Sequence, residues 1–193
     1  MSVEEDIARA VEVLRRGGVI LYPTDTVWGI GCDATNAAAV KRVYEIKGRS
    51  DSKALILLVG SYARLERVAD GIPDVARDLI ECSDKPLTIV YDGVRPNSHV
   101  APNLLAAEGT VAVRVTHEAF SQALCKAFGR PLVSTSANIS GRPAPEVFSQ
   151  IEGKITSAVD YVCESRRDEK PGHASPSTIM RLEADGTFKI LRP

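Results

Sequence analysis

Three basic side chains stand close together just before an apolar run. Lys47, Arg49 and Lys53 fall within seven residues. Gly48 and the polar stretch 50–52 leave the backbone free to turn, so all three cations can point toward one anion. The alternative is a solvated helix end whose cations complement the helix dipole. Binding of an anion is therefore the first chemistry that the sequence suggests.

A second group of polar residues follows an apolar run in "PLVSTSANISGRPAP". This loop supplies hydroxyl and amide groups from Ser134, Thr135, Ser136, Asn138 and Ser140. A turn needs only one or two such groups, whereas five can hold phosphate or carboxylate oxygens. The stretch "YPTDTVWGIGCDA" places further polar residues directly after a strand. Taken alone, these residues are equally consistent with a ligand-binding site and with a simple turn.

Several familiar chemistries find no support in the motifs. The sequence contains no GxxxxGK[ST] phosphate loop, no GxGxxG turn, no GxSxG elbow and no HExxH pair. The serines have no sequence cue for a partnered base, so an acyl-enzyme mechanism is not favoured. A site rich in cations and hydroxyls suits phosphoryl or nucleotidyl transfer, where catalysis is mostly positioning and charge stabilisation.

The elements that must position these groups alternate between helix and strand, which predicts an α/β fold with its ligand site at the strand ends. Ser2 and Glu5 form a capping box for a first helix, and Gly17-Gly18 end it. Thr35 is expected to cap a second helix that ends at Gly48. Further helices are predicted near 61–69, 73–82 and 118–128, and strands at 18–22, 54–59, 87–91, 111–115 and 131–136.

The C-terminal "STIMRLEADGTFKILRP" predicts a hairpin whose turn contains Asp185-Gly186. The stretch 164–176 is rich in charge, proline and glycine, and is either a lid or a solvated connector. A chain of 193 residues can bury one sizeable core, so we expect a single domain over residues 1–193.

Composition limits the setting in which the chain works. A net charge of −1 gives no chain-wide field for a nucleic acid or a membrane. The N-terminus lacks the pattern of a signal peptide and the apolar runs are strand-sized, so we expect a cytoplasmic protein without a membrane partner. Cys32, Cys82, Cys125 and Cys163 are widely spaced, which predicts buried, reduced thiols. Neither cysteines nor histidines show metal-ligand spacing, so no metal held by protein ligands is expected.

Five blocks in order resemble the YrdC/TsaC family of threonylcarbamoyl-AMP synthases: "YPTDTVWGIGCDA", "KGRSDSKALILL", "PLTIVY", "VAVRVTHEAF" and "PLVSTSANISG". They include K-x-R at Lys47-Gly48-Arg49 and S-x-N at Ser136-Ala137-Asn138, and "SPSTIMRL" and "ILRP" also match. The likeness runs nearly end to end. It implies a twisted, open mixed sheet with helices packed around it and a concave, positively charged groove.

The resemblance also implies a reaction. L-threonine, bicarbonate or CO2, and ATP give L-threonylcarbamoyladenylate and pyrophosphate, with Mg²⁺ carried by the ATP. The product supplies N6-threonylcarbamoyladenosine at position 37 of tRNAs that read ANN codons, and other proteins make the transfer to tRNA. We expect the enzyme to be a monomer or a weak dimer.

The residues of the site follow from the same resemblance. Lys47 and Arg49 are expected to be catalytic, and we expect changing either to alanine to abolish adenylate formation while the thermal transition stays near that of the wild type. The residues expected to bind ATP are Lys47, Arg49, Ser52, Lys53, Thr110, Ser136, Asn138 and Arg192. Those expected to bind threonine and its carbamate are Thr26, Arg114, Ser134 and Ser177. The planar fork of Arg114 suits a carboxylate, although strand alternation leaves open an outward-facing position.

Departures from the family pattern and two other functions need to be weighed. Some longer members place a histidine at what appears here as Leu57, and the usual W-P-G reads Ser83-Asp84-Lys85. Longer members carry a second domain, so we expect the single-domain form.

One alternative function is binding of double-stranded RNA or tRNA, but the near-neutral net charge and the small number of aromatic residues argue against it. The other is a carbamoyl-transfer module, which in hydrogenase-maturation proteins accompanies acylphosphatase and zinc-finger regions.

Overall fold

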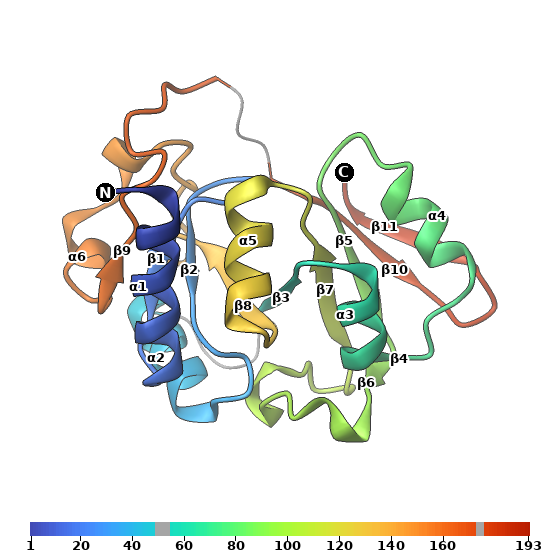
Figure 1. The fold of residues 1–193 in the computed structure, drawn as a ribbon. Helices are drawn as coiled ribbons and strands as arrows, with labels where there is room; N and C mark the ends of the chain where they lie inside the picture. The colour runs from blue at the N-terminus through green and yellow to red at the C-terminus, as the bar shows by residue number, and fades with distance from the viewer. Residues whose placement is uncertain (49–54, 173–175) are drawn as a thin grey trace.

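A mixed β-sheet runs through the molecule (Figure 1). The structure is a computed structural model that describes residues 1–48, 55–172 and 176–193. The strands of this sheet are β1 (Ile20–Tyr22), β2 (Gly29–Gly31), β3 (Ile56–Val59), β5 (Leu87–Tyr91), β7 (Val111–Val115), β8 (Leu132–Ser136), β9 (Tyr161–Val162), β10 (Thr178–Leu182) and β11 (Phe188–Arg192). Within the described ranges their order is β11-β10-β5-β7-β3-β8-β2-β1-β9. A separate small sheet pairs β4 (Ala69–Asp70) with β6 (Gly93–Val94).

Parallel and antiparallel pairs alternate irregularly across the sheet, as expected for the predicted α/β class. Strands β3 and β7, β5 and β10, and β1 and β9 are parallel, and the other neighbours are antiparallel. In β3, Ile56 lies opposite Ala112 of β7 and Leu58 opposite Arg114. Because side chains alternate along a strand, these residues share one face, whereas Leu57 points to the other.

The helices divide between the two faces of the sheet. The helices α1 (Val3–Arg15) and α5 (Ala119–Phe128) lie side by side over one face (Figure 1), where they bury Leu58 of β3 and Leu132 of β8. The helices α2 (Ala37–Lys47), α3 (Tyr62–Val68) and α4 (Val75–Glu81) contribute to the main core, which contains Leu57 and Val59. The first face is therefore covered at β1, β3 and β8, but a cavity lies farther along it.

Most predicted elements are confirmed. Ser2 and Glu5 form the expected capping box on α1, with Glu5 N donating to Ser2 Oγ and Ser2 N donating to Glu5 Oε2. Predicted helices near 61–69, 73–82 and 118–128 match α3, α4 and α5. The C-terminal hairpin is β10 and β11, with Gly186 in the left-handed conformation that its turn requires. Remaining short helices are η1 (Pro96–Ser98), η2 (Pro102–Leu104), η3 (Phe148–Gln150) and α6 (Gly153–Thr156).

Two predictions are wrong in detail. The cap of α2 is Asn36 rather than Thr35: Asn36 Oδ1 accepts hydrogen bonds from the backbone of residues 38 and 39, while Thr35 Oγ1 donates to Asp33 Oδ1. Cys82 is exposed, because it follows the last turn of α4, whereas the other three cysteines are buried as expected. The short strands β2, β4, β6 and β9 were not predicted.

No helix among the described residues is long and apolar enough to cross a membrane. Residues 164–172 contain neither helix nor strand, as expected for the stretch that begins there. The remaining part of that stretch includes residues 173–175, which lie outside the described ranges.

Candidate functional site

A cavity of about 350 Å³ opens on the α1 and α5 face, beyond the part that these helices cover. Its walls come from the start of β3, the middle of β7, the end of β8 and the start of β10. Strand ends are where α/β sheets collect ligand-binding groups. The predicted site residues that line it are Thr26, Arg114, Ser134, Ser136, Ser177 and Arg192.

Arg114 is the most deeply placed cation of this cavity. Its side chain is only 4% exposed, and Nη2 lies 3.1 Å from Oδ1 of Asp25. Its Nε is buried and has no hydrogen-bond partner in the described part of the protein. The outward-facing alternative is therefore wrong, and a buried donor remains for an anionic ligand.

Arg192 brings a second guanidinium group to the same cavity. It donates to the backbone oxygen of Ser177 from Nε at 3.1 Å and from Nη2 at 2.8 Å, and to Ser177 Oγ at 3.2 Å. Ser177 Oγ in turn lies 2.8 Å from Thr88 Oγ1. Burial lowers the pKa of Arg192, and the nearby positive charge of Arg114 lowers it further. A bound anion would offset this repulsion.

Hydroxyl groups line the same cavity as these arginines. Thr24 Oγ1 donates to the backbone oxygen of Val27 at 2.7 Å, and lies 3.0 Å from Thr26 Oγ1. Ser134 is buried in the middle of β8, beside the fully buried Tyr22. Burial raises the pKa of Tyr22, and a hydrogen bond with Ser134 opposes that change only in part. The site therefore offers neutral donors and acceptors beside its two cations.

Lys47 lies deeper than a solvated helix end would. It is 2% exposed, and Nζ donates to the backbone oxygens of Ser136 at 2.5 Å and Asn138 at 2.9 Å. The lysine thereby ties the C-terminus of α2 to the S-x-N segment. Neither Lys47 nor Asn138 is among the residues that line the cavity. The solvated alternative is wrong for Lys47, whereas Arg49, Ser52 and Lys53 lie outside the described residues.

Two other residues sit away from the cavity. Thr110 is buried, its hydroxyl donates to Glu108 Oε1 at 3.0 Å, and it does not line the cavity. Leu57 belongs to the main core on the opposite face, while Ile56 lines the cavity. A threonine contact from residue 57 is therefore not available in this arrangement.

Sequence reasoning missed two charged residues near the site. Asp25 was visible only as part of a polar turn, yet it is the ion-pair partner of Arg114. Arg166 looked like one charge in a solvated run, yet Nη1 donates to the backbone oxygen of Thr24 at 2.9 Å and lies 3.3 Å from Glu118. It lines a neighbouring cavity of about 520 Å³ that shares Thr24, Thr26 and Val27 with the first. No sequence signal distinguished Arg166.

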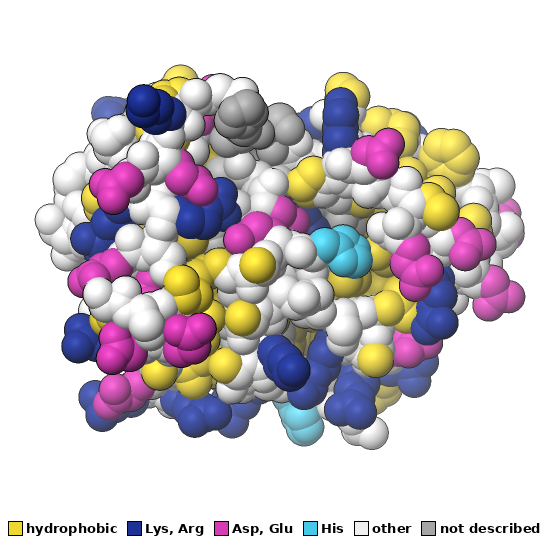
Figure 2. All heavy atoms as spheres, turned by 45° about the horizontal axis from the view of Figure 1, so that its top comes forward, with side chains coloured by type: hydrophobic (Ala, Val, Ile, Leu, Met, Phe, Trp, Pro, Cys, Tyr) yellow, Lys and Arg dark blue, Asp and Glu magenta, His cyan; other side chains and the backbone are white. Residues whose placement is uncertain are grey.

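The face of the molecule drawn in Figure 2 carries charge of both signs. Figure 2 shows acidic and basic side chains interspersed on the left side of the molecule, with basic ones more frequent along its lower edge. The positive charge of the groove therefore stays a prediction beyond Arg114 and Arg192. Within residues 1–48, 55–172 and 176–193, no group of three or more metal-ligating side chains is arranged to hold an ion.

Comparisons of the sequence and of the structure with known proteins point to the same protein family. The family model Sua5_yciO_yrdC, described as "Telomere recombination", matches residues 12–193. The chain is 38% identical to the threonylcarbamoyl-AMP synthase of Pseudoalteromonas translucida over 93% of this chain and 94% of that protein. It is 37% identical to the protein of the same name from Escherichia coli, over 90% and 89% of the two chains.

Solved structures share the fold over nearly the whole chain. Sua5 from P. abyssi in complex with L-threonine superposes with a TM-score of 0.88 at 29% identity, covering all of this chain and 55% of that one. This chain therefore spans about half the length of that relative. Escherichia coli YciO superposes with a TM-score of 0.81 at 26% identity, over 99% of this chain and 89% of YciO. The chain belongs to the Sua5/YciO/YrdC family.

Proposed function

We propose that this protein is a threonylcarbamoyl-AMP synthase. The observation that carries the proposal is the cavity in which Arg114 and Arg192 lie close enough to repel each other, beside the hydroxyl groups of Ser134 and Ser177. Two cations and several hydroxyls suit an anionic substrate pair. The relatives that bear this name, aligned over most of the chain, support the assignment.

The reaction joins two anions. The amine of threonine adds to CO2 and loses a proton, which gives a carbamate. A carbamate oxygen then attacks the α-phosphorus of ATP, so that a new P–O bond forms while the bond to the β-phosphate oxygen breaks and pyrophosphate leaves. The substrates repel each other electrostatically, and cations placed between them lower the barrier by offsetting that repulsion.

The cavity suggests which residues hold each substrate. Arg114, with its partnerless Nε, would bind the threonine carboxylate or the carbamate, with Thr26, Ser134 and Ser177 around it. Arg192 and Ser136 would contact the nucleotide. Lys47 would keep Ser136 and Asn138 in place and, with the segment that follows it, meet the phosphates. The roles of Arg49, Ser52, Lys53 and Thr110 stay predictions.

Other parts of the proposal rest on the reaction itself. ATP would enter as its Mg²⁺ complex, with the ion held by the phosphates and treated as part of the substrate. Bicarbonate would supply the CO2, and tRNA would receive the threonylcarbamoyl group through other proteins. A single domain, a monomer or weak dimer, and a cytoplasmic location remain predictions.

Pyrophosphate release by the purified chain tests this function. Mixtures with Mg²⁺-ATP, L-threonine and bicarbonate are compared with mixtures that lack threonine or bicarbonate, and the nucleotide product is identified by its mass. We expect release only in the complete mixture, with the mass of threonylcarbamoyl-adenylate.

Two variants make this test sharper. Arg114→Ala should abolish release, whereas Arg142→Ala, which removes an exposed arginine paired with Glu152, should leave it unchanged. ATP binding without any release by the wild type would overturn the proposal. Binding of tRNA in a salt titration would then be measured, because RNA binding is the remaining alternative.

A further inference from the structure

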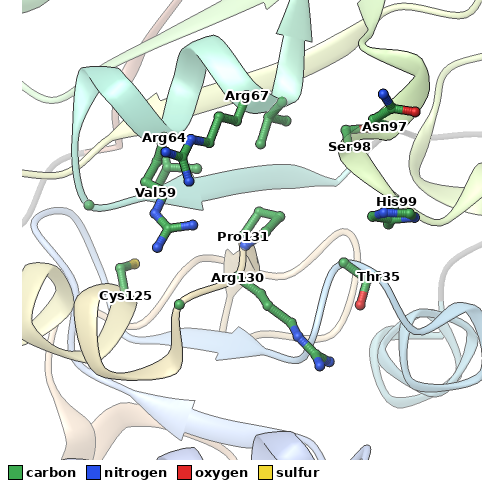
Figure 3. Close-up of a pocket in the computed structure, with 13 residues that line it drawn as sticks. Thr35, Val59, Arg64, Arg67, Asn97, Ser98, His99, Cys125, Arg130 and Pro131 are labelled. Atoms are coloured by element: carbon green, nitrogen blue, oxygen red, sulfur yellow. The ribbon is translucent and has the colours of Figure 1, made fainter.

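A second cavity, of about 400 Å³, lies at the opposite ends of the same strands (Figure 3). In the antiparallel pair β3 and β8, Ile56 lies opposite Ser134 and marks the end that carries the candidate active site. The second cavity is lined by Val59 and Gly60 at the other end of β3, and by Pro131 just before β8. The two cavities share none of the residues that line them.

Basic side chains surround this second cavity. Arg64 and Arg67 extend from α3, Arg130 comes from the segment after α5, and His99 lies across from them (Figure 3). None of the residues that line the cavity is acidic. Among the described residues, neither Arg64 nor Arg67 forms an ion pair. The guanidinium groups of Arg64 and Arg67 lie near each other on one side of this space, whereas that of Arg130 extends away from them (Figure 3).

One nearby carboxylate offsets part of this charge. Asp33 Oδ2 lies 2.8 Å from Arg130 Nη1, and its side chain is 4% exposed. Its Oδ1 accepts a hydrogen bond from Thr35 Oγ1 at 2.7 Å, so both oxygens of the carboxylate are engaged. Because Asp33 neutralises Arg130, the charge that remains at the cavity is that of Arg64 and Arg67, about two, which matches a phosphate monoester near neutral pH.

The cavity floor is apolar and differs from the charged rim. Val59, Val68 and Cys125 are buried, and Pro131 adds a further apolar surface. Burial raises the pKa of the Cys125 thiol to about 12, so this sulfur stays neutral and apolar. Asn97 and Ser98 add polar groups at the rim. A cationic rim over an apolar floor fits a ligand with a phosphate attached to a flat, weakly polar group.

We propose that this cavity binds a nucleotide, with its phosphate held by Arg64 and Arg67 and its base against the apolar floor. Planar guanidinium groups bind phosphate oxygens in pairs, which favours phosphate over a single carboxylate. The volume lies within the range of small-molecule sites. The nucleotide is either free or part of an RNA chain, since both present the same chemistry. This site is separate from the one proposed for the synthase.

Nuclear magnetic resonance of the intact, ¹⁵N-labelled protein tests the proposal. Adenosine monophosphate is titrated in one series and a short single-stranded oligoadenylate in another. We expect saturable shifts of the backbone amides of residues 97–99, 129 and 130. The amides of Ser134 and Ser136 report the candidate active site independently. Failure of the synthase assay would leave this result unaffected, so the two proposals fail separately.

The double variant Arg64→Ala, Arg67→Ala should weaken binding at this cavity at least tenfold. Both side chains are exposed, so the variant should fold, and its thermal transition checks this. The matched control is Arg142→Ala, which should leave the affinity unchanged. Tighter binding of oligoadenylate than of the mononucleotide would identify RNA as the source. Shifts confined to the active-site amides, non-saturating shifts, or an unaltered affinity in the double variant would each overturn the proposal.

Discussion

At the scale of single residues, Arg114 is the clearest link between structure and proposed chemistry. Burying a charge is costly unless it is paired, and Asp25 pairs with only part of this guanidinium group. The partnerless Nε therefore remains a cost in the free protein that a bound anion would remove. A carboxylate or a carbamate can accept a hydrogen bond from this Nε, which supports the proposed role of Arg114 in binding threonine.

Arg114→Lys keeps the positive charge beside Asp25 but removes the planar fork. If one or two charge-assisted hydrogen bonds are lost, each contributing about 1.5–3 kcal/mol, kcat/KM for threonine should fall at least tenfold. Steady-state kinetics with threonine varied at saturating ATP measures this, and most of the change should appear in KM for threonine. Arg142→Lys serves as the control. An unchanged KM for threonine would contradict the assigned role.

Lys47→Met removes the ammonium group and keeps most of the side-chain volume. The sequence predicts that loss of this charge abolishes activity without affecting stability, but the structure leads us to expect both effects. The backbone oxygen of Asn138 would lose the Lys47 donor, and that of Ser136 would keep only its bond from the backbone N of Asn138, so we expect a cost of roughly 1–3 kcal/mol. Urea unfolding at neutral pH measures the difference. A midpoint equal to that of the wild type would show that the two hydrogen bonds contribute nothing.

At the scale of elements, the N-terminus of α2 shows how a sequence pattern can miss by one position. Thr35 and Asn36 are both good capping residues. The hydroxyl of Thr35 is already engaged by Asp33, whereas Asn36 has the extended backbone of a cap and its side chain accepts from the first turn. The position of α2 matters because its last residue, Lys47, holds the S-x-N segment.

Asn36→Ala should lower the free energy of unfolding by about 1 kcal/mol, because the amides of residues 38 and 39 lose their acceptor. Asn36→Asp keeps an acceptor at the same place and should remain close to the wild type. Denaturant unfolding of the three proteins compares them directly. Equal destabilisation by both substitutions would mean that capping is not the cause.

At the scale of the whole molecule, Asp6 joins the first helix to the segment near the site. This carboxylate is 1% exposed and accepts hydrogen bonds from the Tyr161 hydroxyl, from the backbone of Glu164 and from both the backbone and hydroxyl of Ser165. The next residue, Arg166, contacts the backbone of Thr24. Burial alone would raise the pKa of Asp6, but the hydrogen bonds outweigh it and lower the pKa below its ordinary value.

The lowered pKa makes this contact dependent on pH. An unfolded aspartate titrates near 4, so the stabilisation is fully present above about pH 4 and is lost as the pH falls through the lower pKa of the folded state. Asp6→Asn should cost roughly 1–3 kcal/mol at pH 7, because its amide cannot accept all of these bonds. The difference from the wild type should narrow below about pH 4.

Thermal unfolding from pH 7 to pH 3 measures this difference in Tm. The control is Asp84→Asn, which changes an exposed carboxylate and should show no such trend. A constant difference between Asp6→Asn and the wild type across this range would mean that the hydrogen bonds favour both protonation states of Asp6 equally.

The order of amino acids was enough to predict the local features of this protein. Capping boxes, helix-ending glycines and alternating apolar runs depend on neighbouring residues, so α1, α3, α4, α5 and the C-terminal hairpin could be predicted. The order and the residues of the motif blocks in this one sequence were enough to indicate the family. Short strands such as β2 and β9 could not be predicted, because two or three residues become a strand only through a partner distant in the chain.

Only the tertiary structure decided how these residues are arranged around the site. Strand register placed Arg114 inside the cavity and Leu57 on the opposite face. Folding also brought Asp25 to Arg114 and Arg166 to Thr24. These contacts join segments far apart in the chain, and no local pattern carries that information. The second cationic cavity arose in the same way, from arginines of two elements whose sequences suggest only solvated surface charge.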